Sequence, residues 1–207
     1  MRRSLWYFTV KYKPVCFSDF QRVFGQMATL TKDQWAEAGL ALLNEKGYTD
    51  LSIVKLAQKL NVTRGSFYYH FKSLNDLIDA MISTWEERVV NQGFDQILTD
   101  IENPKQEVKN LIEYVTHLTD RLDLVFRQWA PSNEHVKQHM ARLDQKRLNT
   151  LEGLFQRLTG DKKKGEILSR VAFYGHIGSL HTFPTPNAKQ QRETAFEVFD
   201  MMMNYLD

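Results

Sequence analysis

Residues 60–72 read Leu60-Asn61-Val62-Thr63-Arg64-Gly65-Ser66-Phe67-Tyr68-Tyr69-His70-Phe71-Lys72, and this run is the most informative part of the chain. Thr63 is a residue type that caps helix N-termini, and Phe67 and Phe71 lie one helical turn apart. The run therefore predicts a short helix that starts at Arg64 and turns both phenylalanines towards a core. Asn61, which tolerates positive φ, stands where a tight turn must precede that helix.

A second short helix precedes this turn. Ser52 is placed to cap it, and apolar residues recur at helical spacing over residues 53–60. Two short helices held at a fixed angle need a small residue where they approach each other, and Ala57 meets that need. Val62 and Phe67 fill the gap between them. Together these features predict a helix-turn-helix.

The outward face of the predicted second helix indicates its chemistry. With the phenylalanines inward, the 100° step of a helix places Gly65 and Tyr69 on the opposite face, where they fit the major groove of DNA. Residues 48–72 carry four basic side chains and one acidic one, on a chain whose net charge is only +2. Such a local patch indicates a polyanion contacted at one place. The candidate DNA-contacting residues are Ser52, Lys55, Thr63, Arg64, Gly65, Ser66, Tyr68, Tyr69, His70 and Lys72.

Two points about this face stay open. Tyr68, Tyr69 and His70 have an alternative role as an aromatic cluster that holds the small domain together. The N-terminus of the next helix, after Ser73, is a further place where a phosphate would be favoured.

The remaining sequence predicts an all-α fold, because no segment alternates with period two for long enough to form a strand. Helices are expected from Thr31 to Gly47, from Ser73 to about residue 92, and over about 104–118, 122–129, 134–158, 165–182 and 188–206. Lys162–Lys164 are expected in a loop. Residues 27–73 would form a three-helix DNA-binding domain, and residues 74–207 a helical domain for dimerisation and ligand binding.

Residues 1–26 differ from the rest of the chain. They carry five basic side chains and one acidic one, include Pro14, and show no clean period, whereas Met27 opens a segment that reads like a fresh start. Two interpretations remain: a loose tail or mis-assigned translation start, or a basic arm that contacts DNA.

The helix-turn-helix segment resembles the signature of the TetR family of bacterial transcriptional regulators. The resemblance is carried by Gly47-Tyr48-Thr49-Asp50-Leu51-Ser52, by Leu56-Ala57, by residues 60–72 and by Leu77. It covers about residues 31–82. Leu74 departs from the pattern, because many members carry lysine there, and this puts one phosphate contact in doubt.

The resemblance implies a homodimer that binds a palindromic DNA operator, and repression that an unidentified small-molecule effector relieves. Two half-sites are also what so small a module needs for specific binding. The dimer would form through the last two helices as a four-helix bundle, using the stripes Val171, Phe173, Tyr174, Ile177, Gly178 and Leu180, and Phe196, Phe199, Met202, Met203 and Leu206. Candidate walls of an effector pocket are Trp85, Tyr114, His117, Phe126, Trp129, Phe155, Phe173 and His176.

Other functions have less support. His135 and His139 lie four apart on one helix face, but no third metal ligand is apparent nearby, so we expect no metal site and no cofactor. No phosphate-cradling glycine loop, nucleophile elbow or paired carboxylates indicate an enzyme. No membrane span or export signal appears, and Cys16 is the only cysteine, so we expect a cytoplasmic, nucleoid-associated protein. A ligand-independent activator or nucleoid factor, and a helical interaction protein with a vestigial helix-turn-helix, remain alternatives.

Overall fold

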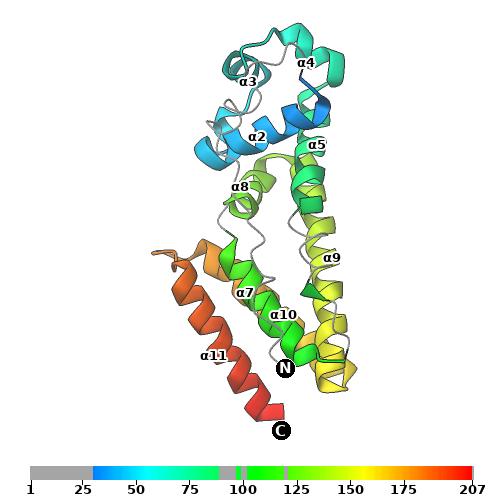
Figure 1. Cartoon of the computed structure of the whole chain (residues 1–207), viewed down its shortest axis with the longest axis vertical. Coiled ribbons are helices and arrows are strands. Elements are labelled where there is room, and N and C mark those ends of the chain that lie inside the picture. Colours follow the sequence, from blue (N-terminus) through cyan, green and yellow to red (C-terminus); the bar gives the residue numbers. More distant parts are fainter. Residues whose placement is uncertain (1–29, 89–96, 99–101, 119–120, 207) are drawn as a thin grey trace, which may run out of the picture.

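The computed structural model describes residues 30–88, 97–98, 102–118 and 121–206, with side chains through Asn204. Within these ranges the chain forms helices and no strand, as the sequence predicts. The helices build an elongated molecule, with α3 and α4 at one end and α7, α10 and α11 at the other (Figure 1). The expectations for residues 1–26 lie outside the described residues.

Among the described residues, the first end of the molecule has four helices. They are α2 (Lys32–Lys46), α3 (Ile53–Lys59), α4 (Arg64–His70) and α5 (Leu74–Glu86), with the 3₁₀ turn η1 (Tyr48–Asp50) after α2. Each begins at a hydroxyl side chain that accepts a backbone N–H, and these caps are Thr31, Ser52, Thr63 and Ser73. Such caps satisfy donors that the first turn of a helix leaves free. Gly47 ends α2 with a φ of 77°, as expected.

The described residues after Glu86 add five further helices and a 3₁₀ turn. They are α7 (Pro104–His117), α8 (Leu122–Trp129), η3 (Ala130–Ser132), α9 (Glu134–Thr159), α10 (Lys162–His181) and α11 (Ala188–Leu206). Pro104 occupies the first position of α7, where its missing N–H costs nothing. None of the helices in the described part of the chain is long and apolar enough to cross a membrane.

The expected loop at Lys162–Lys164 is wrong, because these residues form the first turn of α10. Asp161 caps that helix: its Oδ1 accepts the N–H of Lys164 at 3.0 Å. The negative carboxylate also offsets the unfavourable placing of three lysines at the positive end of the helix dipole. Lysines alone indicated solvent exposure, which is correct, but they did not reveal the cap. The predicted helix to about residue 92 is confirmed only as far as Glu86, and residues 89–92 lie outside the described residues.

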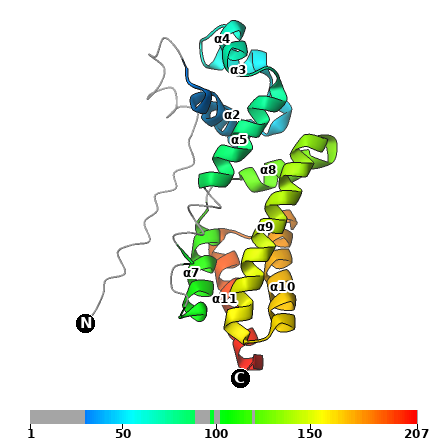
Figure 2. The same cartoon turned by 90° about the vertical axis from the view of Figure 1, so that its right-hand side faces the viewer.

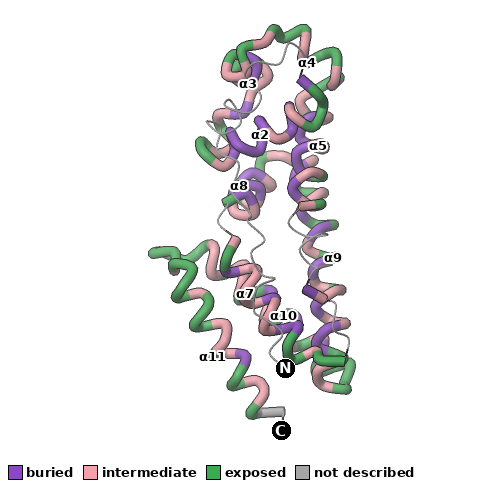
Figure 3. Tube along the Cα trace, viewed as in Figure 1, coloured by how far each residue is buried: buried purple, intermediate pink, exposed green. Residues whose placement is uncertain are grey.

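Two hydrophobic clusters hold the fold together. The first joins α2–α5 to α8 and to the beginning of α9, and includes Trp35, Phe67, Trp85 and Phe126. The second lies among α7, the end of α9, α10 and α11. Helix α9 runs along the long axis of the molecule and contributes to both clusters (Figure 2), and its buried residues recur at helical spacing from Val136 to Phe155. Figure 3 shows burial along this helix.

Close contact between α9 and α10 depends on a glycine. A Cβ added to Gly165 would lie 2.8 Å from the backbone nitrogen of Gln156 and 2.9 Å from its Cα, which is closer than real Cβ contacts. Because backbone atoms cannot move aside as a flexible side chain can, a larger residue here would push the two helices apart.

Candidate nucleic-acid interface and inner cavity

Helix α4 turns one face to the core and the other to solvent, as predicted. Phe67 and Phe71 are 0% and 2% exposed, whereas Tyr69 is 85% exposed. The Phe67 ring stacks on Phe71 with centroids 5.3 Å apart and meets the edge of Trp35 at 5.5 Å. These contacts fix the rotation of α4 about its own axis, so that Tyr69 and Gly65 point away from the protein.

The turn between α3 and α4 has the predicted geometry. Asn61 has a φ of 55°, which is the left-handed conformation that asparagine adopts more readily than most residues. The N–H of Val62 then donates to the carbonyl of Ala57 at 3.0 Å. Together with the bond from the Asn61 N–H to the carbonyl of Gln58, it caps the C-terminal end of α3 and turns the chain towards the start of α4.

All ten candidate DNA-contacting residues lie at this end of the molecule. Seven are exposed, and Ser52, Ser66 and His70 are partly exposed. A Cβ at Gly65 would meet only Thr63 Oγ1, at 3.5 Å, so the backbone is open to a close neighbour. No element of the described chain covers α4 on its outer side (Figure 3).

The aromatic residues of this face divide between the two roles that the sequence left open. Tyr68 is half exposed, yet its ring meets the edge of Phe67 at 5.3 Å, so it supports the core while reaching solvent. Tyr69 contacts His70 edge-on at 4.9 Å and is otherwise exposed. Tyr69 is therefore the aromatic residue most available to a partner.

Two carboxylates modify the expected phosphate sites. Lys55 Nζ lies 2.5 Å from Asp50 Oδ1, and this contact lowers the pKa of Asp50. At the start of α5, Asp76 accepts the backbone N–H of Lys72 at 2.9 Å and the hydroxyl of Ser73 at 2.9 Å, which lowers the pKa of Asp76. Because Asp76 already supplies a negative group there, this helix N-terminus is a poorer place for a phosphate than the sequence suggested.

The second hydrophobic cluster lines a partly open cavity of about 330 Å³. Its walls come from α7, α9, α10 and α11, with Asp123 of α8, and are mostly apolar. Of the eight candidate pocket residues, the structure brings Tyr114, Phe155, Phe173 and His176 to the cavity. Trp85, Phe126 and Trp129 are instead buried in the first cluster. The side chain of His117 is 70% exposed and does not reach the cavity.

One side of the cavity is charged, which the sequence pattern did not indicate. Asp123 and Arg147 both line it, and Arg147 Nη1 donates to Asp123 Oδ2 at 2.6 Å. Arg127 joins them, donating to Asp123 at 2.7 Å and to both oxygens of Asp144 at 2.6 and 2.8 Å. Two guanidinium groups thus face two carboxylates in a largely buried network.

Burial and charge act in opposite directions in this network. Burial alone would raise the pKa of Asp123, but Arg147 and Arg127 outweigh it, so the pKa lies below its usual value. His176 borders the same region. Its burial lowers its pKa, although the charge of Asp123 opposes the shift. The cavity therefore offers ionised carboxylate and guanidinium groups beside a neutral imidazole.

A signal for Arg147 was present in the sequence. It occupies the apolar stripe of α9, between Leu143 and Leu151, where a charged residue is out of place unless it is paired. Asp123 and Arg127 stand four apart on α8, the spacing of an ion pair on a helix. Together the stripe and the spacing would have indicated a buried ionic cluster, though not its position beside the cavity.

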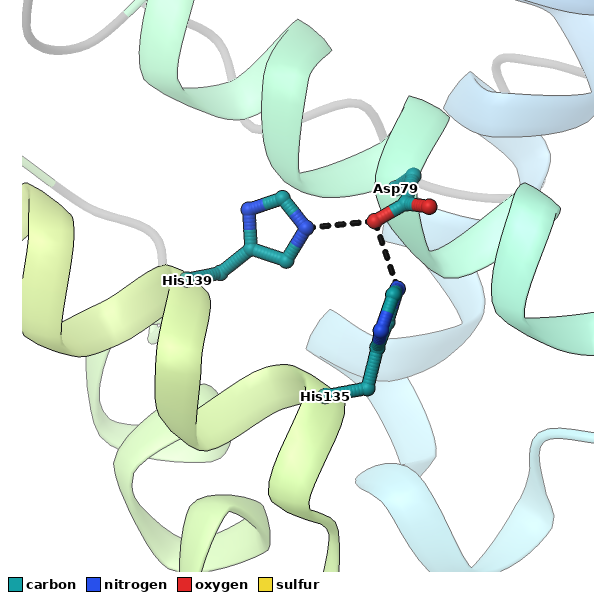
Figure 4. A group of neighbouring side chains, drawn as sticks. All are labelled: Asp79, His135 and His139. Carbon is teal, nitrogen blue, oxygen red and sulfur yellow. Dashed lines mark hydrogen bonds and ion pairs between the residues drawn. The ribbon is translucent and has the colours of Figure 1, made fainter.

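A second polar cluster joins α5 to α9. His135 Nε2 and His139 Nε2 both contact Oδ1 of Asp79, the former at 2.6 Å (Figure 4). Asp79 is 56 and 60 residues from the two histidines, so no local pattern indicated this third group. In the described part of the chain, these three are the residues whose donor atoms could hold a metal ion.

Comparison with known proteins agrees with this geometry. A family model described as "Bacterial regulatory proteins, tetR family" matches residues 36–81. The tetracycline repressor protein class D of Escherichia coli is 42% identical over 55 residues, which make up 27% of this chain and only 25% of that repressor. An uncharacterized HTH-type transcriptional regulator in the lacX 3′ region of Lactococcus lactis subsp. lactis is 28% identical over 145 residues, 68% of this chain and 69% of that protein.

The fold likeness extends beyond the matched segment. The crystal structure of a TetR transcription regulator from Haloarcula marismortui has a TM-score of 0.69, at 19% identity, over 82% of this chain and 96% of that one. The family model that matches residues 36–81 is one of regulatory proteins. The matched helix-turn-helix and the shared helical fold lead to one conclusion: residues 36–81 match the TetR family of bacterial regulatory proteins, and the chain as a whole has the fold of a TetR transcription regulator.

Proposed function

We propose that the chain is a transcriptional regulator that binds double-stranded DNA with α4 in the major groove. The observation that carries this proposal is the orientation of α4, whose buried phenylalanines leave Tyr69 85% exposed at one end of the molecule. A short, exposed helix at a molecular end, with its rotation fixed by a core, is what groove insertion requires.

The residues of this end divide into two roles. Arg64 and Tyr69 face outward from α4 and would contact base edges, with Gly65 allowing the backbone to approach. Hydroxyl groups and lysines at the helix starts, such as Thr63 and Lys72, would contact phosphates, which orient the protein without reading sequence. Lys55 would have to leave Asp50 to reach a phosphate, so we assign it the weaker contribution.

The operator would be palindromic and bound by a homodimer formed through α10 and α11. Support comes from apolar side chains that the monomer leaves exposed: Val171 at 49% and Tyr174 at 59%, which belong to the predicted stripe of α10, and Met201 at 63%, a residue of α11 outside the predicted stripe. Phe173 and Phe199, from the same predicted stripes, are buried in the second cluster of the monomer. Each stripe would therefore serve the monomer core on one side and the partner on the other.

The cavity is the proposed effector site. Its apolar walls, with Asp123, Arg147 and His176 on one side, suit an apolar or aromatic compound that carries a polar group. An effector relieves repression only if it binds better to a state whose two recognition helices are wrongly spaced. The DNA-binding part would comprise residues 27–73 and the sensing part residues 74–207. The first cluster spans both parts, which would couple them.

The DNA-binding proposal is tested by fluorescence anisotropy at several salt concentrations, with duplexes from the region upstream of the protein's own gene. Arg64→Ala should weaken specific binding about 5- to 150-fold, the range for a lost base contact of about 1–3 kcal/mol. Lys72→Ala should weaken all duplexes equally and reduce the salt slope by about 1. Lys163→Ala, which removes an exposed charge at the far end of the molecule, is the matched control and should change neither.

Other outcomes favour the alternatives. A wild-type protein with no preference among duplexes would point to a helical interaction protein with a vestigial helix-turn-helix. Specific binding without any stabilising metabolite in a thermal-shift screen would favour a ligand-independent activator or nucleoid factor. Sedimentation of a stable monomer would contradict the dimer.

A further inference from the structure

The cluster of Asp79, His135 and His139 lies outside both the proposed DNA interface and the cavity. His135 and His139 are successive-turn neighbours on α9, and their rings meet edge-on with centroids 5.3 Å apart. Asp79 reaches them from α5. The three donor atoms, two imidazole nitrogens and one carboxylate oxygen, all lie within 4.8 Å of one another. Figure 4 shows the three side chains converging on one point between the two helices.

This donor set matches a particular class of ion. Zn²⁺ takes imidazole nitrogen and carboxylate oxygen at about 2.0–2.2 Å, in a tetrahedral arrangement whose ligand atoms lie roughly 3.3 Å apart. The present spacings are close enough that small rotations of the side chains would create that arrangement. We propose that Asp79, His135 and His139 form a site for one divalent transition-metal ion of the Zn²⁺ type, bridging α5 and α9.

The burial of the three residues fits such a site. The Asp79, His135 and His139 side chains are 44%, 34% and 17% exposed, so an ion has a path in from solvent. Three protein ligands leave a fourth position for water or a small anion. One carboxylate and two neutral imidazoles would leave a net charge of +1 with the ion bound. The partly exposed position allows solvent to screen this charge.

Arg142 opposes metal binding at this site. Its guanidinium lies 2.9 Å from His139 Nδ1, and because arginine can only donate, this nitrogen must be the acceptor. The proton of a neutral His139 then sits on Nε2, where it donates to Asp79. A metal ion on Nε2 needs the proton on Nδ1 instead, facing an acceptor. Metal binding therefore requires the exposed Arg142 to turn away, and Arg142 weakens the site.

A bound ion would lock two helices together. Across the same α5–α9 contact, Lys146 Nζ lies 3.2 Å from Glu86, and the Arg147 guanidinium lies 5.4 Å from the centre of the Trp85 ring. Coordination would replace the present hydrogen bonds between Asp79 and the two histidines with stronger bonds to one ion. Any effect on DNA affinity rests on the proposed function, because α5 directly follows the recognition helix. Metal binding itself does not rest on it.

The test is Zn²⁺ titration of the full chain by calorimetry, without DNA. Saturable binding of one Zn²⁺ per chain is expected, and His135→Gln and His139→Gln should each weaken it about 100-fold or more, beyond the loss seen when only surrounding groups are altered. His181→Gln is the matched control, since it removes an exposed histidine at the end of α10 and should leave the affinity unchanged. No saturable binding to the wild type, or wild-type affinity in both the His135→Gln and His139→Gln variants, would overturn the site.

Two further measurements keep the test independent of folding defects in the variants. Wild-type protein with Co²⁺ should show the ligand-field absorption of a low-symmetry nitrogen and oxygen site, and a spectrum identical to aqueous Co²⁺ would count against the proposal. Zn²⁺ about 100-fold above its Kd should raise the Tm of the wild type by roughly 5–10 °C. Arg142→Ala should tighten Zn²⁺ binding about tenfold, and weaker binding in this variant would refute the role given to Arg142.

Discussion

The two ends of the molecule differ in how tightly their hydrophobic cores are packed. Around α4 the core is closed: Phe67 contacts both Trp35 and Phe71, and all three are almost fully buried. Around α10 the core is open, with a cavity of about 330 Å³ and a paired set of buried charges beside it. A closed core holds a recognition helix in one orientation, whereas an internal space with polar groups is suited to receiving another molecule.

The two ends also differ in how far apart their parts lie in sequence. The helix-turn-helix is assembled from helices that follow one another, each with its own capping residue. The cavity needs side chains from α7, α8, α9, α10 and α11, which span residues 104–206. Local signals therefore describe the first end well and the second end poorly.

The largest expected effect comes from truncating the closed core. Phe67→Ala should lower the free energy of unfolding by about 3–5 kcal/mol, because the lost ring leaves a void that its tightly packed neighbours cannot fill. Phe155→Ala should cost about 1 kcal/mol less, since Phe155 already borders a cavity and makes fewer contacts on that side. Urea denaturation of both variants checks the difference, and an equal or larger loss for Phe155→Ala would contradict it.

The next effect tests the charged side of the cavity. Asp123→Asn keeps the shape of the side chain but leaves Arg147 and Arg127 short of a negative partner, and should cost about 3 kcal/mol, the lower end for breaking a buried pair. Asp144 remains to neutralise part of the charge. The control is Glu134→Gln, which breaks the exposed pair with Lys137 and should cause no measurable change. Equal stability of the two variants would show that the buried network contributes little.

The smallest effect concerns pH. Burial lowers the pKa of His176 in the folded protein below its ordinary value of 6.5. Below pH 6.5 the unfolded chain therefore binds this proton more readily, and stability falls as the pH drops towards the folded pKa. His176→Leu should lose a few degrees less in Tm than the wild type between about pH 7.5 and about pH 5.5. His117→Gln, at an exposed position, should follow the wild type, and identical losses in all three proteins would contradict the argument.

The sequence was sufficient where the signal lay within a few residues. Caps such as Ser52 and Thr63, the turn at Asn61, and the paired Phe67 and Phe71 each depend on neighbours along the chain, and each was predicted correctly. The prediction of a loop at the start of α10 is wrong because it rests on the charge of the three lysines, whereas the cap supplied by Asp161 allows a helix to start there.

The sequence was insufficient where the answer depended on distant segments. Helical spacing shows that Trp85 and Phe126 are buried, but not that they belong to the first cluster rather than to the cavity. Likewise, His135 and His139 were seen to share a helix face, while their contact with Asp79 depends on how α5 packs against α9. Only a tertiary structure decides which buried faces meet.

Helix α9 connects the region beside α5 to the cavity. Its 26 residues form a single rod about 39 Å long, with one end beside α5 and the other among the cavity walls. A tilt of α9 by about 5° about one end moves its other end by roughly 3 Å. A small rearrangement of the side chains around a molecule bound in the cavity would therefore produce a larger displacement at the far end of the helix. In a symmetric dimer, α9 of each chain would tilt. The distance between the two α4 helices would then change by twice the displacement of one α4 along the line that joins them.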